Sequence, residues 1–304
     1  MTLPEPGLFP RRLTLELTNE CNYNCAMCPS RIDRSWARGL MEERLFRKLV
    51  DEAAGYPPVA LVPFFRGESL LHPRLAELLK YAKIKGLEPI QLATNGSLLD
   101  EATARGLLEA GLDFLSFSLD SMRPEEYARI RPGGRLDRVV DNIQRFLDLR
   151  DRGGYGTEVQ VSATRTALNR ESLGELVEYW RPLADRVRVY YEHSADGRTG
   201  SLDCAEVPGD MPRRACHKVF TDLVVYYDGG VAACNHDWFR HPPLGDAREK
   251  SLAAIWTSPA YEDLRRQHLE PERLTDQTCQ GCDHWKVNYL EKPFIGEVYE
   301  SKAA

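Results

Sequence analysis

The stretch RLTLELTNECNYNCAMC, residues 12–28, decides the fold, because a strand-like run leads directly into three closely spaced cysteines. The run RLTLELT at 12–18 is typical of a β-strand. Cys21, Cys25 and Cys28 then follow on the loop at its carboxyl end. Parallel α/β folds bind their ligands at this end of their strands, so the sequence predicts a ligand site at these thiols.

The bulk composition narrows the class of protein. With 304 residues the chain is long enough for one large domain and a smaller appendage. Its 40 basic and 46 acidic residues give a formal charge of -6, which offers no electrostatic footprint for nucleic acid. We find no signal peptide and no apolar run of about 18 residues that could span a membrane. A cytoplasmic protein without nucleic-acid or membrane partners is therefore expected.

The first two thirds of the chain alternate short apolar runs with longer helical patterns, which predicts an α/β fold of repeated βα units around a parallel sheet. The strand-like runs are 12–18, 59–65, 89–94, 114–119, 158–163 and 187–191. Amphipathic helical patterns lie between them, at 42–53, 73–86, 99–111, 135–154 and 170–180. Pattern alone leaves an open sheet, a barrel and a partial barrel possible, and the length favours six units over eight.

The amino-acid composition of the chain changes near residue 195. A polar segment rich in Gly, Asp and Pro is expected to be a linker, 196–212. FTDLVVYY and VAAC then flank a DGG turn, which predicts a β-hairpin, and one helix is expected at 251–269. The predicted division of the chain is thus 1–195, 196–212 and 213–304.

Seven of the eight cysteines fall into two groups, which in a reducing cytoplasm indicates metal ligands or redox groups. Three thiolates on a four-iron cluster leave one iron open to a substrate or cofactor. A structural zinc site completed by a distant ligand is the alternative for this first group. The second group holds four cysteines and could bind zinc or an iron-sulfur cluster: Cys216, Cys234, Cys279 and Cys282.

The CxxxCxxC motif after the first strand of a six-unit βα chain resembles that of the radical S-adenosylmethionine (SAM) superfamily. The resemblance implies a partial (βα)6 TIM-like barrel with a 4Fe-4S cluster on Cys21, Cys25 and Cys28. In that family the open iron is chelated by SAM, whose reductive cleavage gives a 5'-deoxyadenosyl radical that abstracts hydrogen from the substrate. A flavodoxin or ferredoxin is then implied as the electron donor.

Residues at other strand ends extend the resemblance. FFRGES at 64–69 is similar to the family's Gly-Gly-Glu element, with Gly67 and Glu68 placed for the SAM amino group and Arg66 in place of the first glycine. The other implied SAM-binding residues are Tyr23, Asn95, Ser118, Asp120, Ser162 and Arg165. Plainer roles are also open: Glu68 and Asp120 could cap helices, Asn95 could be a turn residue and Arg165 a surface residue.

The last four cysteines, with the DGGVAAC hairpin and the later LAAIW stretch, resemble the twitch module, a shortened SPASM module. This small C-terminal β-hairpin-plus-helix module is similar to that of the butirosin-pathway dehydrogenases that oxidise 2-deoxy-scyllo-inosamine. It implies a second, fully ligated auxiliary 4Fe-4S cluster. The implied activity is oxidation of a small-molecule substrate, such as a sugar or aminocyclitol, with the auxiliary cluster as electron acceptor.

Alternatives within and beyond this activity stay open. Cys204, the remaining cysteine, could return a hydrogen atom to a substrate radical, which would make the protein an epimerase; it could also be a buried small hydrophobe or an exchange ligand. A maturase acting on a ribosomal peptide and a catalytically silent metal scaffold are the other two possibilities.

Overall fold

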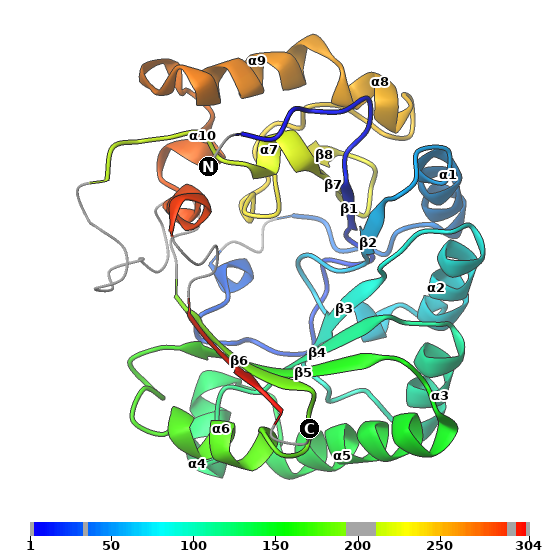
Figure 1. Cartoon of the computed structure of the whole chain (residues 1–304), viewed down its shortest axis with the longest axis vertical. Helices are drawn as coiled ribbons and strands as arrows, with labels where there is room; N and C mark the ends of the chain where they lie inside the picture. The colour runs from blue at the N-terminus through cyan, green and yellow to red at the C-terminus, as the bar shows by residue number, and fades with distance from the viewer. Residues whose placement is uncertain (1–2, 33–35, 193–210, 291–295, 302–304) are drawn as a thin grey trace.

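The computed structural model describes residues 3–32, 36–192, 211–290 and 296–301. Six parallel strands follow one another in chain order and form a curved array (Figure 1). One parallel bridge, Leu61 to Ile90, joins the second strand to the third. All six predicted strands are confirmed: β1 Arg12–Leu15, β2 Ala60–Val62, β3 Gln91–Thr94, β4 Phe114–Ser118, β5 Glu158–Arg165 and β6 Arg186–Tyr191.

Helices cover the outer face of this array (Figure 1). Their apolar residues recur every three or four positions and pack on the strands in one hydrophobic core. The five predicted helices are present as α1 Glu43–Ala53, α2 Leu75–Ile84, α3 Glu101–Glu109, α5 Leu136–Gly153 and α6 Leu173–Trp180. The sequence analysis missed α4, Pro124–Ile130. None of the described helices is long and apolar enough to cross a lipid bilayer.

The C-terminal part of the chain extends the barrel sheet at both edges. The predicted hairpin is confirmed: β7 Asp222–Val225 pairs antiparallel with β8 Val231–Ala232, and β7 also lies parallel to β1. At the other edge β9, Gly296–Glu300, pairs antiparallel with β6. The domain division proposed from the sequence stays a prediction.

The single helix expected at 251–269 is wrong, because the structure has two: α8 Leu252–Trp256 and α9 Pro259–Leu269. The Ser258 side chain accepts a hydrogen bond from the Tyr261 N–H, and Pro259 occupies the first turn of α9. A serine cap followed by proline starts a new helix. The remaining short elements are α7 Lys218–Thr221, α10 Gln277–Gln280, and the 3-10 turns η1 Pro29–Arg31, η2 Ser69–Leu71, η3 Pro271–Arg273 and η4 His284–Tyr289.

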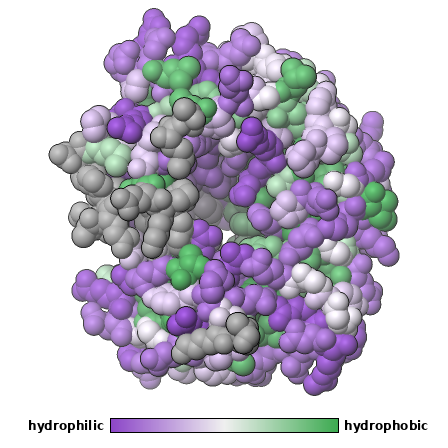
Figure 2. All heavy atoms as spheres, in the orientation of Figure 1, coloured by the Kyte–Doolittle hydropathy of each residue, from purple (hydrophilic) through white to green (hydrophobic). Residues whose placement is uncertain are grey.

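Hydrophilic side chains dominate the face drawn in Figure 2, and the hydrophobic residues on it are scattered. Single exposed apolar residues such as Leu8 and Ile84 are ordinary on soluble folds. This face of the molecule therefore does not indicate a binding site. The candidate functional residues lie instead at the carboxyl ends of the barrel strands.

Candidate active site

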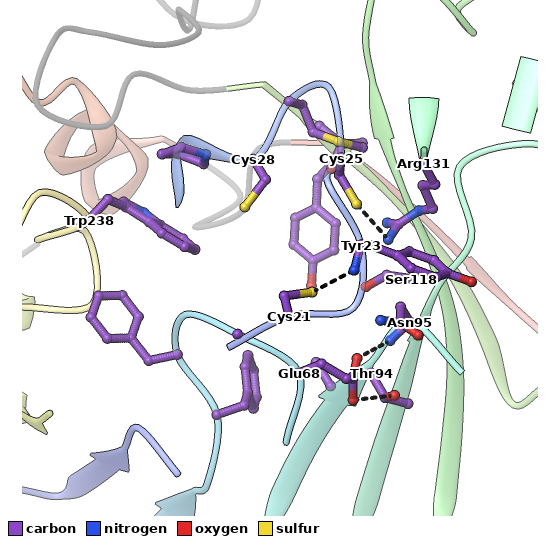
Figure 3. Close-up of a pocket in the computed structure, with 18 of the residues that line it drawn as sticks. Cys21, Tyr23, Cys25, Cys28, Glu68, Thr94, Asn95, Ser118, Arg131 and Trp238 are labelled. Atoms are coloured by element: carbon purple, nitrogen blue, oxygen red, sulfur yellow. Dashed lines mark hydrogen bonds between the residues drawn. The ribbon is translucent and has the colours of Figure 1, made fainter. Parts of the chain in front are cut away.

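The three N-terminal cysteines line a cavity of about 350 Å³ at the carboxyl ends of the barrel strands (Figure 3). Every one of the six strands, or the loop that follows it, contributes to the lining. The contributing residues include Cys21, Cys25, Cys28, Phe64, Gly67, Glu68, Thr94, Asn95, Ser118, Thr164, Tyr190 and Glu192. A second hollow of about 400 Å³ shares the three thiols with the first. The thiols therefore stand between two hollows that can receive a cluster and its ligand.

The cysteine loop is held in place by the segment that follows α4. The backbone N–H groups of Asn24 and Ala26 donate to the carbonyls of Pro132 (3.2 Å) and Ile130 (2.8 Å). Tyr23, predicted to bind cofactor, lines the cavity, is almost fully buried and places its hydroxyl 3.4 Å from that of Tyr127. These contacts tie the cysteine loop to α4 and the segment after it.

The protein walls around these thiols disfavour the thiolate form. Cys21 is exposed to the hollow, yet partial burial, with Glu68 and the other two cysteines, raises its pKa to about 11. Burial also raises the pKa of Cys25, and the guanidinium of Arg131, whose Nη1 lies 3.6 Å from the Cys25 Sγ, opposes that rise. Iron binding must therefore supply the free energy for deprotonation.

The three thiols form a donor set that suits an iron-sulfur cluster, because soft thiolates are the ligands such clusters take. The thiolates of a 4Fe-4S cluster attach to different irons, so they need not converge on one point. The donor set therefore fits the iron-sulfur group that the sequence implies.

Glu68 has a capping role in the structure, and its predicted contact with the SAM amino group stays a prediction. Its buried carboxylate accepts hydrogen bonds from the Thr94 hydroxyl (2.7 Å) and from the backbone N–H groups of Asn95 (2.8 Å) and Leu70 (3.1 Å), the last of which caps η2. Burial raises the pKa of Glu68, and these bonds counter the rise. Two carboxylate oxygens offer about four acceptor positions, so one stays available to a ligand amino group in the cavity.

Gly67 is required by the backbone. It has φ +81°, and an added Cβ would lie 2.5 Å from the Thr18 carbonyl oxygen and 2.6 Å from that of Glu20. Asn95 lines the cavity, but its side-chain oxygen accepts bonds from the N–H and hydroxyl of Ser97, as expected of a turn residue. Its amide donates to Asn22 at 3.0 Å, so it also ties the cysteine loop to β3.

Of the remaining predicted SAM-binding residues, Ser118 lines the cavity but Asp120 does not. Asp120 is buried with φ +69°, and its carboxylate accepts from Arg131 (2.6 Å) and from the Thr164 N–H (2.7 Å). It does not cap α4, whose N-cap is Arg123. Direct SAM contact by Asp120 stays a prediction that this geometry does not favour, because its carboxylate instead orients Arg131 toward Cys25.

Ser162 and Arg165 are also absent from the cavity wall. The Ser162 hydroxyl donates to the Phe117 carbonyl at 3.1 Å inside the sheet. Arg165 forms an ion pair with Glu297 of β9 at 2.7 Å and stacks on Tyr191. Their predicted SAM contacts have no support in this geometry. Cys204 lies outside the described residues.

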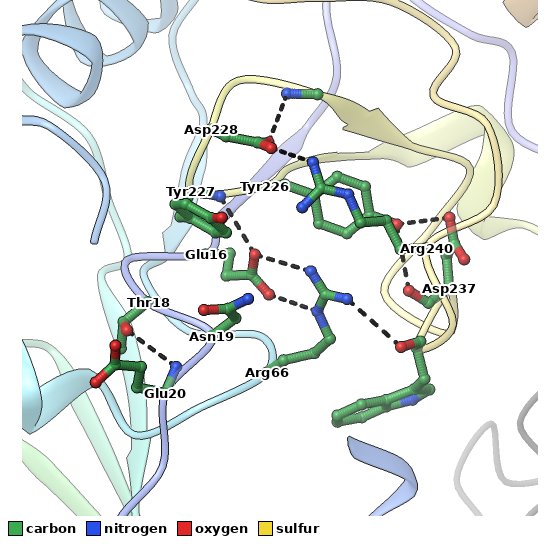
Figure 4. A network of polar contacts seen from close by, with 12 residues as sticks. Glu16, Thr18, Asn19, Glu20, Arg66, Tyr226, Tyr227, Asp228, Asp237 and Arg240 are labelled. Carbon is green, nitrogen blue, oxygen red and sulfur yellow. Dashed lines mark hydrogen bonds and ion pairs between the residues drawn. The ribbon is translucent and has the colours of Figure 1, made fainter. Parts of the chain in front are cut away.

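Arg66, the departure from the family's glycine, joins the end of β2 to the C-terminal part (Figure 4). Its guanidinium is buried and makes a bidentate ion pair with Glu16, at 2.6 and 3.0 Å. A third nitrogen lies 3.5 Å from the carbonyl of Trp238, and the ring of Tyr226 lies 4.6 Å away. Trp238 itself lines the cysteine cavity, so Arg66 holds part of that wall. The sequence analysis missed Trp238 and Arg131.

The four C-terminal cysteines lie near one another, with Cys234 and Cys279 buried and the other two half-buried. Cys216 precedes α7, Cys234 follows β8, and the other two lie in and just after α10. Burial raises the pKa of Cys282 to about 12, and the nearby charge of Cys216 adds to it. Burial and then the charges of Cys282 and Cys216 raise the pKa of Cys234. All four thiols are free, which suits a fully ligated cluster.

Hydrogen bonds orient two of these cysteines. The His236 N–H donates to the Cys234 Sγ at 3.3 Å. The Cys216 N–H donates to Nδ1 of the buried His268 at 3.3 Å, a contact that the sequence analysis did not identify because 52 residues separate the two.

Comparison with known families agrees with this geometry. Residues 15–179, more than half of the chain, match the family model described as the radical SAM superfamily. Residues 216–283 match SPASM, described as an iron-sulfur cluster-binding domain, and this range contains all four C-terminal cysteines.

Two curated relatives are similar over different lengths. The chain is 26% identical to the tungsten-containing aldehyde ferredoxin oxidoreductase cofactor-modifying protein of Pyrococcus furiosus, over 92% of this chain and 90% of that protein. It is 27% identical to a probable GTP 3',8-cyclase of Methanocaldococcus jannaschii, over 60% of this chain and 62% of the cyclase.

Solved structures share the fold at low sequence identity. SuiB of Streptococcus suis bound to S-adenosylmethionine has a TM-score of 0.70 at 16% identity, with 95% of this chain and 76% of SuiB covered. BtrN in complex with AdoMet and 2-DOIA has a TM-score of 0.61 at 16% identity, with 90% and 92% covered. The chain therefore belongs to the radical SAM superfamily, with SAM and 4Fe-4S clusters as its cofactors and a SPASM module in its C-terminal part.

Proposed function

We propose that this protein is a radical SAM oxidoreductase that removes hydrogen from a polar small molecule and passes an electron to the auxiliary cluster. One observation carries the proposal: Trp238, which lines the SAM-side cavity, follows the auxiliary ligand Cys234 by four residues. The loop that holds the auxiliary cluster therefore also forms a wall of the cavity. A cluster in that position suits an electron acceptor for the substrate.

Each side chain of the cavity has a defined part in this proposal. Bound SAM, cleaved by the reduced cluster, supplies the hydrogen-abstracting radical. Glu68 binds the amino group of SAM through its free acceptor position, and Gly67 lets the chain turn into that position. Arg131, held by Asp120, places positive charge beside Cys25.

A small polar substrate is favoured by the size of the cavity, about 350 Å³, and by its mixture of aromatic and polar walls. The name of the relative that matches most of this chain, a cofactor-modifying protein, also indicates a substrate that is not a peptide. A sugar, an aminocyclitol or a related natural-product intermediate fits this description. The flavodoxin or ferredoxin donor and the cytoplasmic location stay predictions.

A peptide maturase is the second candidate, because the fold is shared with SuiB, which has been solved bound to the precursor peptide SuiA. The discriminating experiment incubates the anaerobically reconstituted enzyme with SAM, reductant and size-fractionated extract of its host, and measures 5'-deoxyadenosine. We expect stimulation by the low-mass polar fraction. Stimulation confined to the peptide fraction would refute the small-molecule substrate, and the Cys25→Ala variant is the inactive control.

A reaction in heavy water distinguishes an epimerase from the proposed oxidoreductase. An oxidised product without deuterium from heavy water agrees with the oxidoreductase. A deuterated, unoxidised product would identify an epimerase, in which Cys204 would be the expected hydrogen donor.

A further inference from the structure

Glu192, which directly follows β6, lines the cysteine cavity. Among the described residues it forms no hydrogen bond and no ion pair, and it is half-buried. Burial raises its pKa, and no charge in the described part of the chain counters this rise. An unpaired carboxylate in such surroundings is costly to keep, and perturbed groups of this kind concentrate at functional sites.

Three other carboxylates near this wall, Glu68, Asp120 and Glu297, have partners among the described residues. Glu68 accepts three hydrogen bonds. Asp120 is bound by Arg131, so the positive charge that Arg131 brings to the cavity is already balanced. Glu297, on the strand beside β6, accepts from Arg165 at 2.7 Å and from the Tyr191 hydroxyl at 3.1 Å. Among the described residues of β6 and the strand beside it, Glu192 is thus a carboxylate available to a ligand.

Glu192 lies on a different wall of the cavity from Glu68, the residue expected to bind the SAM amino group. Glu68 follows β2 and Glu192 follows β6, and β3, β4 and β5 lie between these two strands. The two carboxylates therefore face the cavity from different walls. Tyr190 and Trp238 line the cavity as well, and aromatic ring faces attract cations.

We propose that Glu192 is the recognition group for the substrate, and that the substrate carries a protonated amino group which this carboxylate receives. The inference rests on the proposed function, which supplies a small molecule in this cavity. An amine at Glu192 would balance the unpaired charge, whereas a phosphate or carboxylate there would be repelled. The substrate class is thereby narrowed from polar small molecules to amines, among which aminocyclitols and amino sugars are examples.

The test separates the low-mass extract on a cation exchanger at neutral pH. Each fraction is titrated into the reconstituted wild-type enzyme and into the Glu192→Gln variant, with SAM and reductant, and 5'-deoxyadenosine is measured. We expect wild-type stimulation by the retained, cationic fraction. The variant should need about 10- to 100-fold more of that fraction for half-maximal stimulation, because a charge-assisted hydrogen bond is lost, while its saturating rate changes by less than about twofold.

Two controls isolate the substrate contact. Glu297→Gln removes a carboxylate on the adjacent strand that does not line the cavity, and it should titrate like the wild type. Iron content and SAM affinity, measured by anaerobic calorimetry, should be unchanged in Glu192→Gln, because this carboxylate binds neither cofactor.

The possible outcomes distinguish a failure of the proposed role of Glu192 from a failure of the proposed function. Stimulation by the unretained fraction, or an unchanged half-maximal concentration in Glu192→Gln, overturns the role of Glu192 and leaves the proposed function intact. Stimulation by no low-mass fraction overturns the proposed function itself.

Discussion

Breaking the buried ion pair between Glu16 and Arg66 should destabilise the protein strongly. Both side chains are within 1% of full burial, and two hydrogen bonds of 2.6 and 3.0 Å join them. In Arg66→Met the Glu16 carboxylate keeps one donor, the Tyr227 N–H at 3.2 Å. Leaving one partner of a buried pair uncompensated costs about 3 to 5 kcal/mol in unfolding free energy.

Thermal unfolding of the anaerobic holoenzyme, followed by circular dichroism at one scan rate, measures this loss. At about 2 °C per kcal/mol for a chain of this size, Tm should fall by about 6 to 10 °C in Arg66→Met and in Glu16→Gln. The double variant Glu16→Gln/Arg66→Met should lose much less than the sum, because neither charge is then left alone.

The control is an exposed ion pair in which two nitrogens of the arginine donate to one oxygen of the glutamate. Arg105 and Glu101 on α3 are each more than half exposed, so Arg105→Met should change the unfolding free energy by at most about 0.5 kcal/mol. If Arg66→Met melted within about 1 °C of the wild type, or if the losses of the two single variants simply added, the pair would not hold the structure as argued.

Three further changes test other parts of the site. Gly67→Ala should weaken SAM binding at least about tenfold by calorimetry, because the added Cβ would clash with two backbone carbonyls. Gly86→Ala is the control: Gly86 also has a positive φ, so the substitution strains the backbone as well, but the space around it is open and SAM affinity should not change. Cys279→Ala should halve the iron content, from about eight to about four per chain, while SAM cleavage persists; complete loss of iron would contradict two independent sites. Ser258→Ala should cost about 1 kcal/mol, or about 2 °C in Tm, through the lost cap of α9, and an unchanged Tm would refute that role.

The sequence predicted the parts of this protein that are encoded locally. All six barrel strands and both cysteine groups were identified, because strand pattern and thiol spacing are properties of short segments. The pairing of β9 with β6 was not predicted, since more than 100 residues separate them. The break between α8 and α9 was encoded locally by Ser258 and Pro259, but the continuous apolar pattern hid it.

The residues that line the cavity were also predicted only in part from the sequence. Gly67 and Glu68 were found through the resemblance of FFRGES to the family's Gly-Gly-Glu element, whereas Arg131 and Trp238, which also line the cavity, enter from distant loops. Ser162 lies on a strand that was predicted correctly, yet its hydroxyl bonds within the sheet. Strand ends can be read from a sequence, but which side chains face the cavity depends on tertiary packing.

Arg66 explains how two cofactor sites can share one support. Gly67, at φ +81°, interrupts the alternation of side chains that an extended segment would have. The chain can therefore direct Arg66 to Glu16 and to the Trp238 loop, and Glu68 to the SAM side of the cavity. Because that loop begins at Cys234, a predicted ligand of the auxiliary cluster, this short segment connects the two predicted cluster sites. An oxidoreductase of the proposed kind needs its electron acceptor in a defined place beside the substrate. Arg66, which contacts both Glu16 and the Trp238 loop, is suited to hold that loop there.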